Sequence, residues 1–154
     1  MNPIRRCRGP RGARGAGSDF SGDLAMVKTL QAISAGREAR DLLVAARRPE
    51  GGYVLPPWPD AGAGSTDGAS ASRAVVRLRI VQRRLVGFLD PVEDALYLAA
   101  GLRRLGFAAT FHLGRELAPA IAPGGFHAWV QCGDAVVSTS LPVRDEYVPI
   151  HSSR

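Results

Sequence analysis

The chain has 154 residues, 45% of them hydrophobic, which is enough for one globular domain with a substantial core. No run approaches the roughly 18 consecutive apolar residues of a membrane span, and the start lacks the apolar stretch of a secretory signal, so we expect a cytoplasmic protein with no membrane partner. The formal net charge is +6, and the two cysteines are too few for a disulfide framework or a four-cysteine metal site.

Residues 1–18 form a basic tail rich in Gly, Arg and Pro, which we predict to be disordered and dispensable for folding. All five of its arginines precede the first acid, Asp19, and the rest of the chain carries a formal charge of only about +1. A tail of this kind can bind nucleic acid or an acidic partner. A solvated tail is the more common case, so nucleic acid is not our expected partner.

Residues 19–71 read as a helical segment followed by a connector. Ser21 or Asp23 can cap a helix that runs to Arg48, and Gly36 interrupts it, which predicts one kinked helix or two short ones with a single apolar face. The apolar positions that recur every three residues are Leu24, Val27, Leu30 and Ile33. Residues 49–71 are rich in Pro, Gly and Ser, and Trp58 is more plausible as an anchor to the core than as a recognition motif.

Residues 72–154 contain the clearest elements. Residues 72–86 fit either a helix or a strand, and their length favours a helix whose arginines face solvent or a partner. Residues 90–105 have the full signature of a helix. Asp90 is at the N-cap, Pro91 at the first helical position and Glu93 at the capping-box position, and Gly106 can form the C-terminal cap.

The remaining elements are predicted strands. Residues 107–113 alternate, and so do residues 126–131, where His127 and Trp129 face one way and Ala128 the other. A two-residue turn at 133–134 leads into residues 135–140, and residues 147–150 form a short edge strand. Helices followed by a helix and an antiparallel meander predict an α+β domain.

This half of the chain resembles the transglutaminase-like leader peptidases of lasso-peptide biosynthesis, the family of the microcin-processing protein. The resemblance covers about residues 72–150. It rests on the helix ending in Leu-Arg-Arg-Leu-Gly at 102–106, the run His-Ala-Trp-Val at 127–130 and the Tyr-Val-Pro-Ile element at 147–150. It implies a papain-like or transglutaminase-like fold. It also implies a cysteine peptidase with a cysteine at the start of the helix, a histidine at His127 and an acid about a dozen residues later.

Two of these three positions depart from the family pattern. The helix starts with Asp90-Pro91 and has no cysteine there, and Ser138 and Thr139 stand where the acid is expected. We therefore assign candidate catalytic roles to His127, Asp90 and Thr139. Asp90 is more commonly only a helix cap.

Trp129 and Ser138 are the candidate substrate-binding residues. Cys132 lies five residues after His127 and points to the other face of a regular strand, and Cys7 is in the tail, so neither is a good nucleophile. His112, His127 and Cys132 do not form a convincing zinc set, and we predict no cofactor and no metal.

The sequence thus favours a leader-peptidase homologue of a ribosomal-peptide pathway that has lost or altered the thiol mechanism. Its expected partners are a precursor peptide, a leader-recognition protein and the cyclase of the same pathway. The alternatives are an inactive scaffold that holds a leader peptide or a partner enzyme, and a nucleic-acid-binding protein that uses the tail and the arginines of residues 73–84.

Overall fold

The computed structural model describes residues 19–55, 57–58, 64–119 and 124–153, and their side chains from residue 26 onward. The elements in chain order are α1 Asp19–Ala46, α2 Gly68–Leu85, α3 Pro91–Arg104, β1 Ala109–Glu116, β2 Phe126–Cys132, β3 Ala135–Val136, α4 Val143–Glu146 and β4 Tyr147–Ser153. The tail of residues 1–18, predicted to be disordered, lies outside the described residues.

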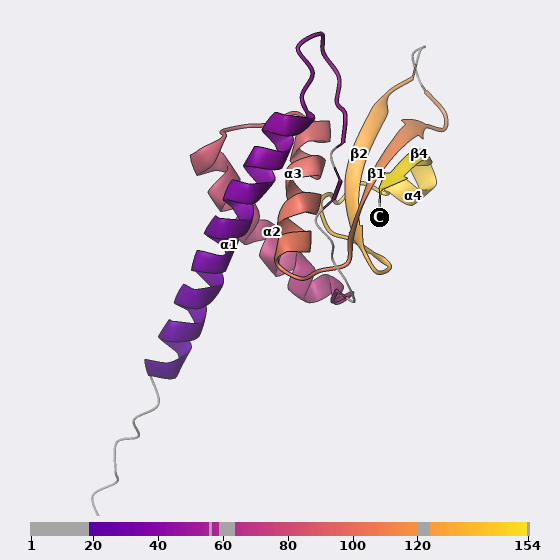
Figure 1. Cartoon of the computed structure of the whole chain (residues 1–154). Helices are drawn as coiled ribbons and strands as arrows, with labels where there is room; N and C mark the ends of the chain where they lie inside the picture. The colour runs from indigo at the N-terminus through magenta and orange to yellow at the C-terminus, as the bar shows by residue number, and fades with distance from the viewer. Residues whose placement is uncertain (1–18, 56, 59–63, 120–123, 154) are drawn as a thin grey trace, which may run out of the picture.

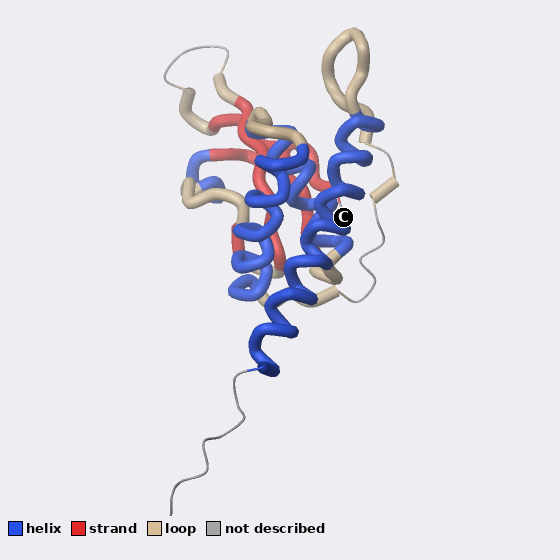
Figure 2. The backbone as a smooth tube through the Cα atoms, turned by 90° about the vertical axis from the view of Figure 1, so that its left-hand side faces the viewer, coloured by secondary structure: helices blue, strands red, loops and turns tan. Residues whose placement is uncertain are grey.

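Helix α3 is the centre of the domain. It packs against α1 and α2 on one side and against β1 and β2 on the other, so the long helices stand together beside the sheet (Figures 1 and 2). Nearly every residue from Ala95 to Leu102 is buried, which is the pattern of a helix covered on all sides. The α+β arrangement expected from the sequence is confirmed.

The ends of α3 have the predicted caps. The Asp90 carboxylate accepts hydrogen bonds from the backbone N–H groups of Val92 and Glu93, both at 2.9 Å, and Pro91 opens the helix. At the other end Gly106 has a φ of +83°, and its N–H donates to the Arg103 carbonyl oxygen. These contacts fix both ends of the element that positions the candidate site.

Helix α1 differs from the prediction. It is one continuous helix, and its packing face consists of small residues, while Val27 and Leu30 are about half exposed. The buried positions are Ala32, Ala35, Ala39, Leu43 and Ala46. Gly36 does not interrupt the helix. It lies where α1 comes close to side chains of α2 and α3. A Cβ atom there would lie 2.6 Å from the Tyr97 hydroxyl oxygen and 2.6 Å from a Val81 methyl group.

Helix α2 confirms the helical interpretation of residues 72–86. It begins four residues earlier than predicted because Asp67 caps it, with a side-chain oxygen that accepts from the Ala69 N–H. The connector before it is anchored as expected. The Trp58 ring lies 6.2 Å from that of Phe111, and the Arg103 guanidinium lies 5.3 Å from the Trp58 ring centre.

The sheet has the strand order β3-β2-β1-β4, and all its pairs are antiparallel. Gly133 makes the predicted turn with a φ of +56°. The predicted strand over 135–140 is wrong beyond Val136. The Ser138 hydroxyl oxygen accepts a hydrogen bond from the Val130 N–H. A side-chain oxygen thus takes the place of the backbone carbonyl that a longer β3 would offer to β2. β4 returns to the far edge beside β1, and the short helix α4 precedes it.

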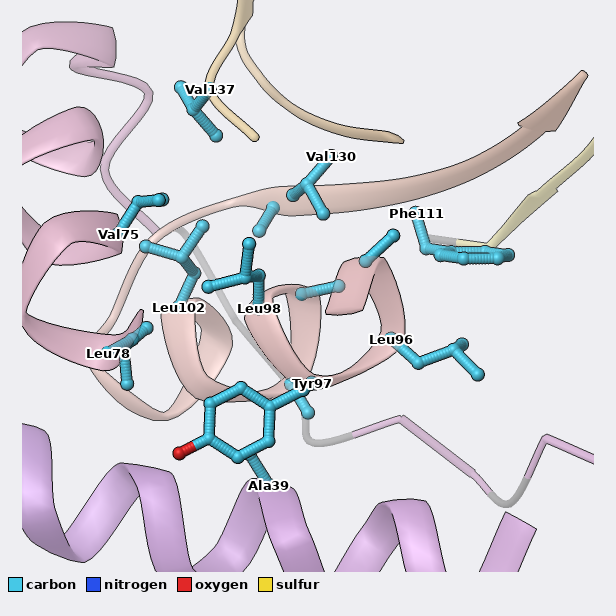
Figure 3. Packing of buried hydrophobic residues seen from close by; sticks show 14 of the residues in the cluster. Ala39, Val75, Leu78, Leu96, Tyr97, Leu98, Leu102, Phe111, Val130 and Val137 are labelled. Carbon is cyan, nitrogen blue, oxygen red and sulfur yellow. The ribbon is translucent and has the colours of Figure 1, made fainter. Parts of the chain in front are cut away.

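The core lies between α3 and the sheet. Figure 3 shows Leu98 and Leu102 of α3 beneath Val130 of β2, while the Tyr97 ring points towards Ala39 of α1. The helices therefore cover one face of the sheet. No described helix has both the length and the apolar character needed to cross a bilayer.

Candidate functional site

An apolar cavity of about 440 Å³ opens between the start of α3, the connector and the helix-facing side of the sheet. Its lining residues are Tyr53, Leu55, Val92, Leu96, Phe111, Leu113 and His151. An apolar cavity with a few polar groups at its edge is the usual form of a small binding site.

A polar network lies beside this cavity at the first turn of α3. The Tyr53 hydroxyl is 3.1 Å from Asp90 Oδ2 and 3.1 Å from Glu93 Oε1, and Arg47 Nε donates to the same Glu93 oxygen at 2.7 Å. Burial, followed by the two carboxylates, raises the pKa of Tyr53, and the hydrogen bond to Glu93 raises the pKa of Arg47. Tyr53 is thus held as a neutral hydrogen-bond donor.

His127 lies on the other face of the sheet. Ala128 and Val130 join the core with α3, so strand alternation directs His127 and Trp129 away from it. The His127 ring lies 5.4 Å from the ring of Tyr147, which begins β4. Its Nε2 is buried with no hydrogen-bond partner among the described residues, and burial lowers its pKa.

Trp129 fills the rest of this second face. It is buried, and its ring stacks on His112 with centroids 5.3 Å apart and planes 14° apart. Its indole Nε1 has no acceptor among the described residues. His127 and Trp129 therefore form one aromatic layer with His112 and Tyr147, behind the sheet as seen from α3.

The candidate catalytic residues do not come together. Asp90 is hydrogen-bonded at the start of α3, and the sheet separates it from the side chain of His127. Thr139 Oγ1 accepts from the Leu141 N–H, and Ser138 Oγ accepts from the Val130 N–H. No hydrogen bond in the described part of the chain joins any of these groups to His127.

Cys132 is buried in the core at the end of β2, and its Sγ lies 3.4 Å from the Ser65 carbonyl oxygen. Burial, and then the charge of Asp67, raises the pKa of its thiol. Its side chain faces the helices and His127 does not, as the alternation predicted. Cys7 lies outside the described residues.

Three of the five arginines of α2 make contacts within the chain. Arg79 donates to Asp94 at 2.9 Å and to the Ser138 carbonyl oxygen at 2.6 Å, and Arg73 donates to Ser70. Arg83 lies over the Phe88 ring at 5.5 Å. Of these arginines, Arg79 is the one in a salt bridge with an acid among the described residues. Within the described residues no group of three or more His, Cys, Asp or Glu side chains is arranged to hold a metal ion.

Two residues beside the cavity were not found from the sequence. The side of the sheet on which His151 lies could not be predicted, because it depends on a register shift between Leu113 and Gly114. The shift brings His151 opposite Leu113 on the helix-facing side. Tyr53 followed a Gly-Gly pair in a connector. The sequence did offer one indication, since an aromatic residue followed by apolar neighbours in a connector can pack against the core as Trp58 does.

The acid sensitivity of the fold should report on His127. Its folded pKa lies below the ordinary value of 6.5, so the unfolded chain takes up the proton first as the pH falls through 6.5. The contribution of neutral His127 to the stability of the fold is therefore complete above that pH. It declines below that pH until the folded pKa is reached. Urea unfolding at about pH 7.5 and about pH 5 should show a smaller loss in His127→Gln than in the wild type. Equal losses would contradict the burial of this ring, and imidazole NMR titration provides a direct check.

The family model of the transglutaminase-like superfamily matches residues 27–152. This range includes α2, α3 and β1 to β3, most of α1, and β4 up to its last residue but one. No curated protein and no solved structure matches the chain. The match covers most of the sequence and agrees with a central helix packed on an antiparallel sheet. The chain belongs to the transglutaminase-like superfamily.

Proposed function

We propose that this chain is a homologue of the lasso-peptide leader peptidases that binds a precursor peptide without a thiol nucleophile. It would act in a ribosomal-peptide pathway beside a leader-recognition protein and a cyclase. The proposal rests on the start of α3, where Asp90 caps the helix and Pro91 opens it. The resemblance to the leader peptidases puts their cysteine at this point of the chain.

The Asp90 carboxylate is already engaged at that place. One oxygen caps the helix and the other accepts from Tyr53. Cys132 does not supply a substitute, because it is buried in the core on the face opposite His127. Without a thiolate at the start of α3 the family's covalent route is absent there, and the groups that remain contribute modestly to hydrolysis. Binding is therefore the better-supported role of the cavity.

Nucleic-acid binding has less support. Arg79 is paired with Asp94, which reduces the number of cations on α2 that can contact phosphates. A phosphate-binding protein loses affinity steeply with salt. Binding of DNA or RNA whose affinity falls steeply between about 50 and about 200 mM salt would favour this alternative over the peptide.

The test uses a synthetic leader peptide copied from any short precursor reading frame that neighbours the gene. Fluorescence anisotropy should show saturable binding by the full chain, while mass spectrometry shows no cleavage products. The double variant Cys7→Ser/Cys132→Ala should bind with the same affinity. Rapid cleavage that is lost in this double variant would overturn the proposal, and so would the absence of binding.

Cys132 itself should react slowly with thiol reagents. Its side chain is fully buried and its thiol pKa is raised, so the reactive thiolate is scarce in the folded state. In Cys7→Ser, labelling by N-ethylmaleimide should be at least about 100-fold slower in buffer than in urea, because opening of the core is required. Labelling at the rate of a free thiol in buffer would contradict the burial of Cys132.

A further inference from the structure

Strand β4 has a free edge. It is the last strand of the sheet, paired only with β1, and residues 148–152 are exposed. No described strand pairs with its outer side. Exposed edges of this kind accept an added strand, and natural proteins protect them with proline or a bulge. Here Pro149 and the register shift protect the first half of β4. Residues 150–152 remain exposed, and Ser153 at the end of the strand is buried.

The open half of β4 borders the cavity. His151 pairs with Leu113, and both face the helices, where the His151 ring lies 6.3 Å from that of Phe111. Both also line the cavity at the start of α3. A strand added beside residues 150–153 would place every second side chain on this same face. The free edge and the cavity therefore form one continuous feature.

Two carboxylates, Asp90 and Glu93, and one cation, Arg47, lie beside the cavity, and Arg47 interacts electrostatically with both acids. Asp90 is hydrogen-bonded to the lining residue Tyr53, and no salt bridge joins it to a cation within the described part of the chain. Glu93, in contrast, is paired with Arg47. A ligand that brings a cation to Asp90 next to an apolar group would complement both the charge and the lining.

We propose that an extended segment of the precursor peptide adds to β4 as a fifth strand and inserts one leucine- or phenylalanine-sized side chain into the cavity. A neighbouring Lys or Arg of the peptide faces Asp90. This inference rests on the proposed function and names its site. Backbone pairing supplies affinity, and the cavity and Asp90 supply selectivity.

The test measures binding of the same synthetic leader peptide to two pairs of matched variants. Val92→Trp fills the cavity, whereas Val76→Trp makes the same change on the 60% exposed side of α2. Asp90→Asn and Asp67→Asn each remove the charge of a helix N-cap and keep a capping side chain. Circular dichroism confirms that each variant folds.

We expect Val92→Trp to weaken binding at least about tenfold, since the inserted side chain loses its burial, while Val76→Trp binds as the wild type. Asp90→Asn should weaken binding about threefold at low salt, and Asp67→Asn should not. Hydrogen exchange at the amides of residues 150–153 should slow when the peptide is added.

Each contrary result has a separate meaning. If the wild type binds and Val92→Trp binds equally well, the cavity is not the site, although the proposed function stands. Binding without protection of residues 150–153 would overturn the strand addition. Protection that rises with protein concentration in the absence of peptide would assign the edge to a second copy of the chain and overturn the inference. If the wild type does not bind the leader at all, the proposed function itself fails.

Discussion

Leu98→Ala is expected to lower the free energy of unfolding by about 2–5 kcal/mol. Leu98 is fully buried in the middle of α3, and Figure 3 shows it beneath Val130 of the sheet. Truncation removes apolar contacts from both layers and leaves a cavity that a helix covered on all sides cannot close. Urea unfolding followed by circular dichroism measures the change.

Leu30→Ala is the matched control. It makes the same truncation in a helix, but Leu30 is 59% exposed on α1, so the cost should stay within about 0.5 kcal/mol. Comparable losses at the two positions would contradict the central place of α3. The comparison also tests which face of α1 is buried, where the sequence-based prediction was wrong.

The sequence predicted α3 well because its signals are local. The Asp90-Pro91 start and Gly106 act through backbone groups a few residues away, and the structure has each of them in its expected role. The turn at Gly133 is local in the same sense. The α+β class follows from the order of such elements, and it could be predicted without knowing their packing.

The face of α1 could not be predicted because packing between helices decides it. The larger apolar residues Val27 and Leu30 suggested the buried side, but the helices approach each other through alanines and Gly36. The Tyr97 hydroxyl occupies the space beside Gly36, which a Cβ atom would otherwise fill. Residue size alone indicated the wrong face, since a close helix contact favours small residues.

The candidate site shows the same limit. The sequence identified the strand of His127 and the opposite orientation of Cys132, because alternation is a property of one strand. The packing of the whole domain decides which face of the sheet α3 covers. Because α3 covers the face opposite the His127 side chain, the sheet separates His127 from Asp90. The position of His151 depends further on an irregularity in the pairing of β1 and β4 that has no local sequence signal.

Gly114→Ala is expected to destabilise the domain by about 1–3 kcal/mol, although it adds only one methyl group. A Cβ atom at Gly114 would lie 2.7 and 2.8 Å from two ring carbons of Trp129 and 3.1 Å from Tyr147 Cβ. Trp129 is fully packed, so the ring must shift or the strands must separate. Urea unfolding gives the energy, and tryptophan fluorescence reports the displacement of the ring.

Gly125→Ala provides the comparison. A Cβ atom there meets only a Glu116 carboxylate oxygen at 3.4 Å, so the cost should be near zero. If Gly114→Ala is as mild as Gly125→Ala, the aromatic layer is loosely packed and can rearrange. If Gly114→Ala is costly, Trp129 and Tyr147 are packed rigidly over the backbone of Gly114. They then hold His127 in place on the side of the sheet away from Asp90. A histidine held there cannot reach the start of α3 by a side-chain rotation.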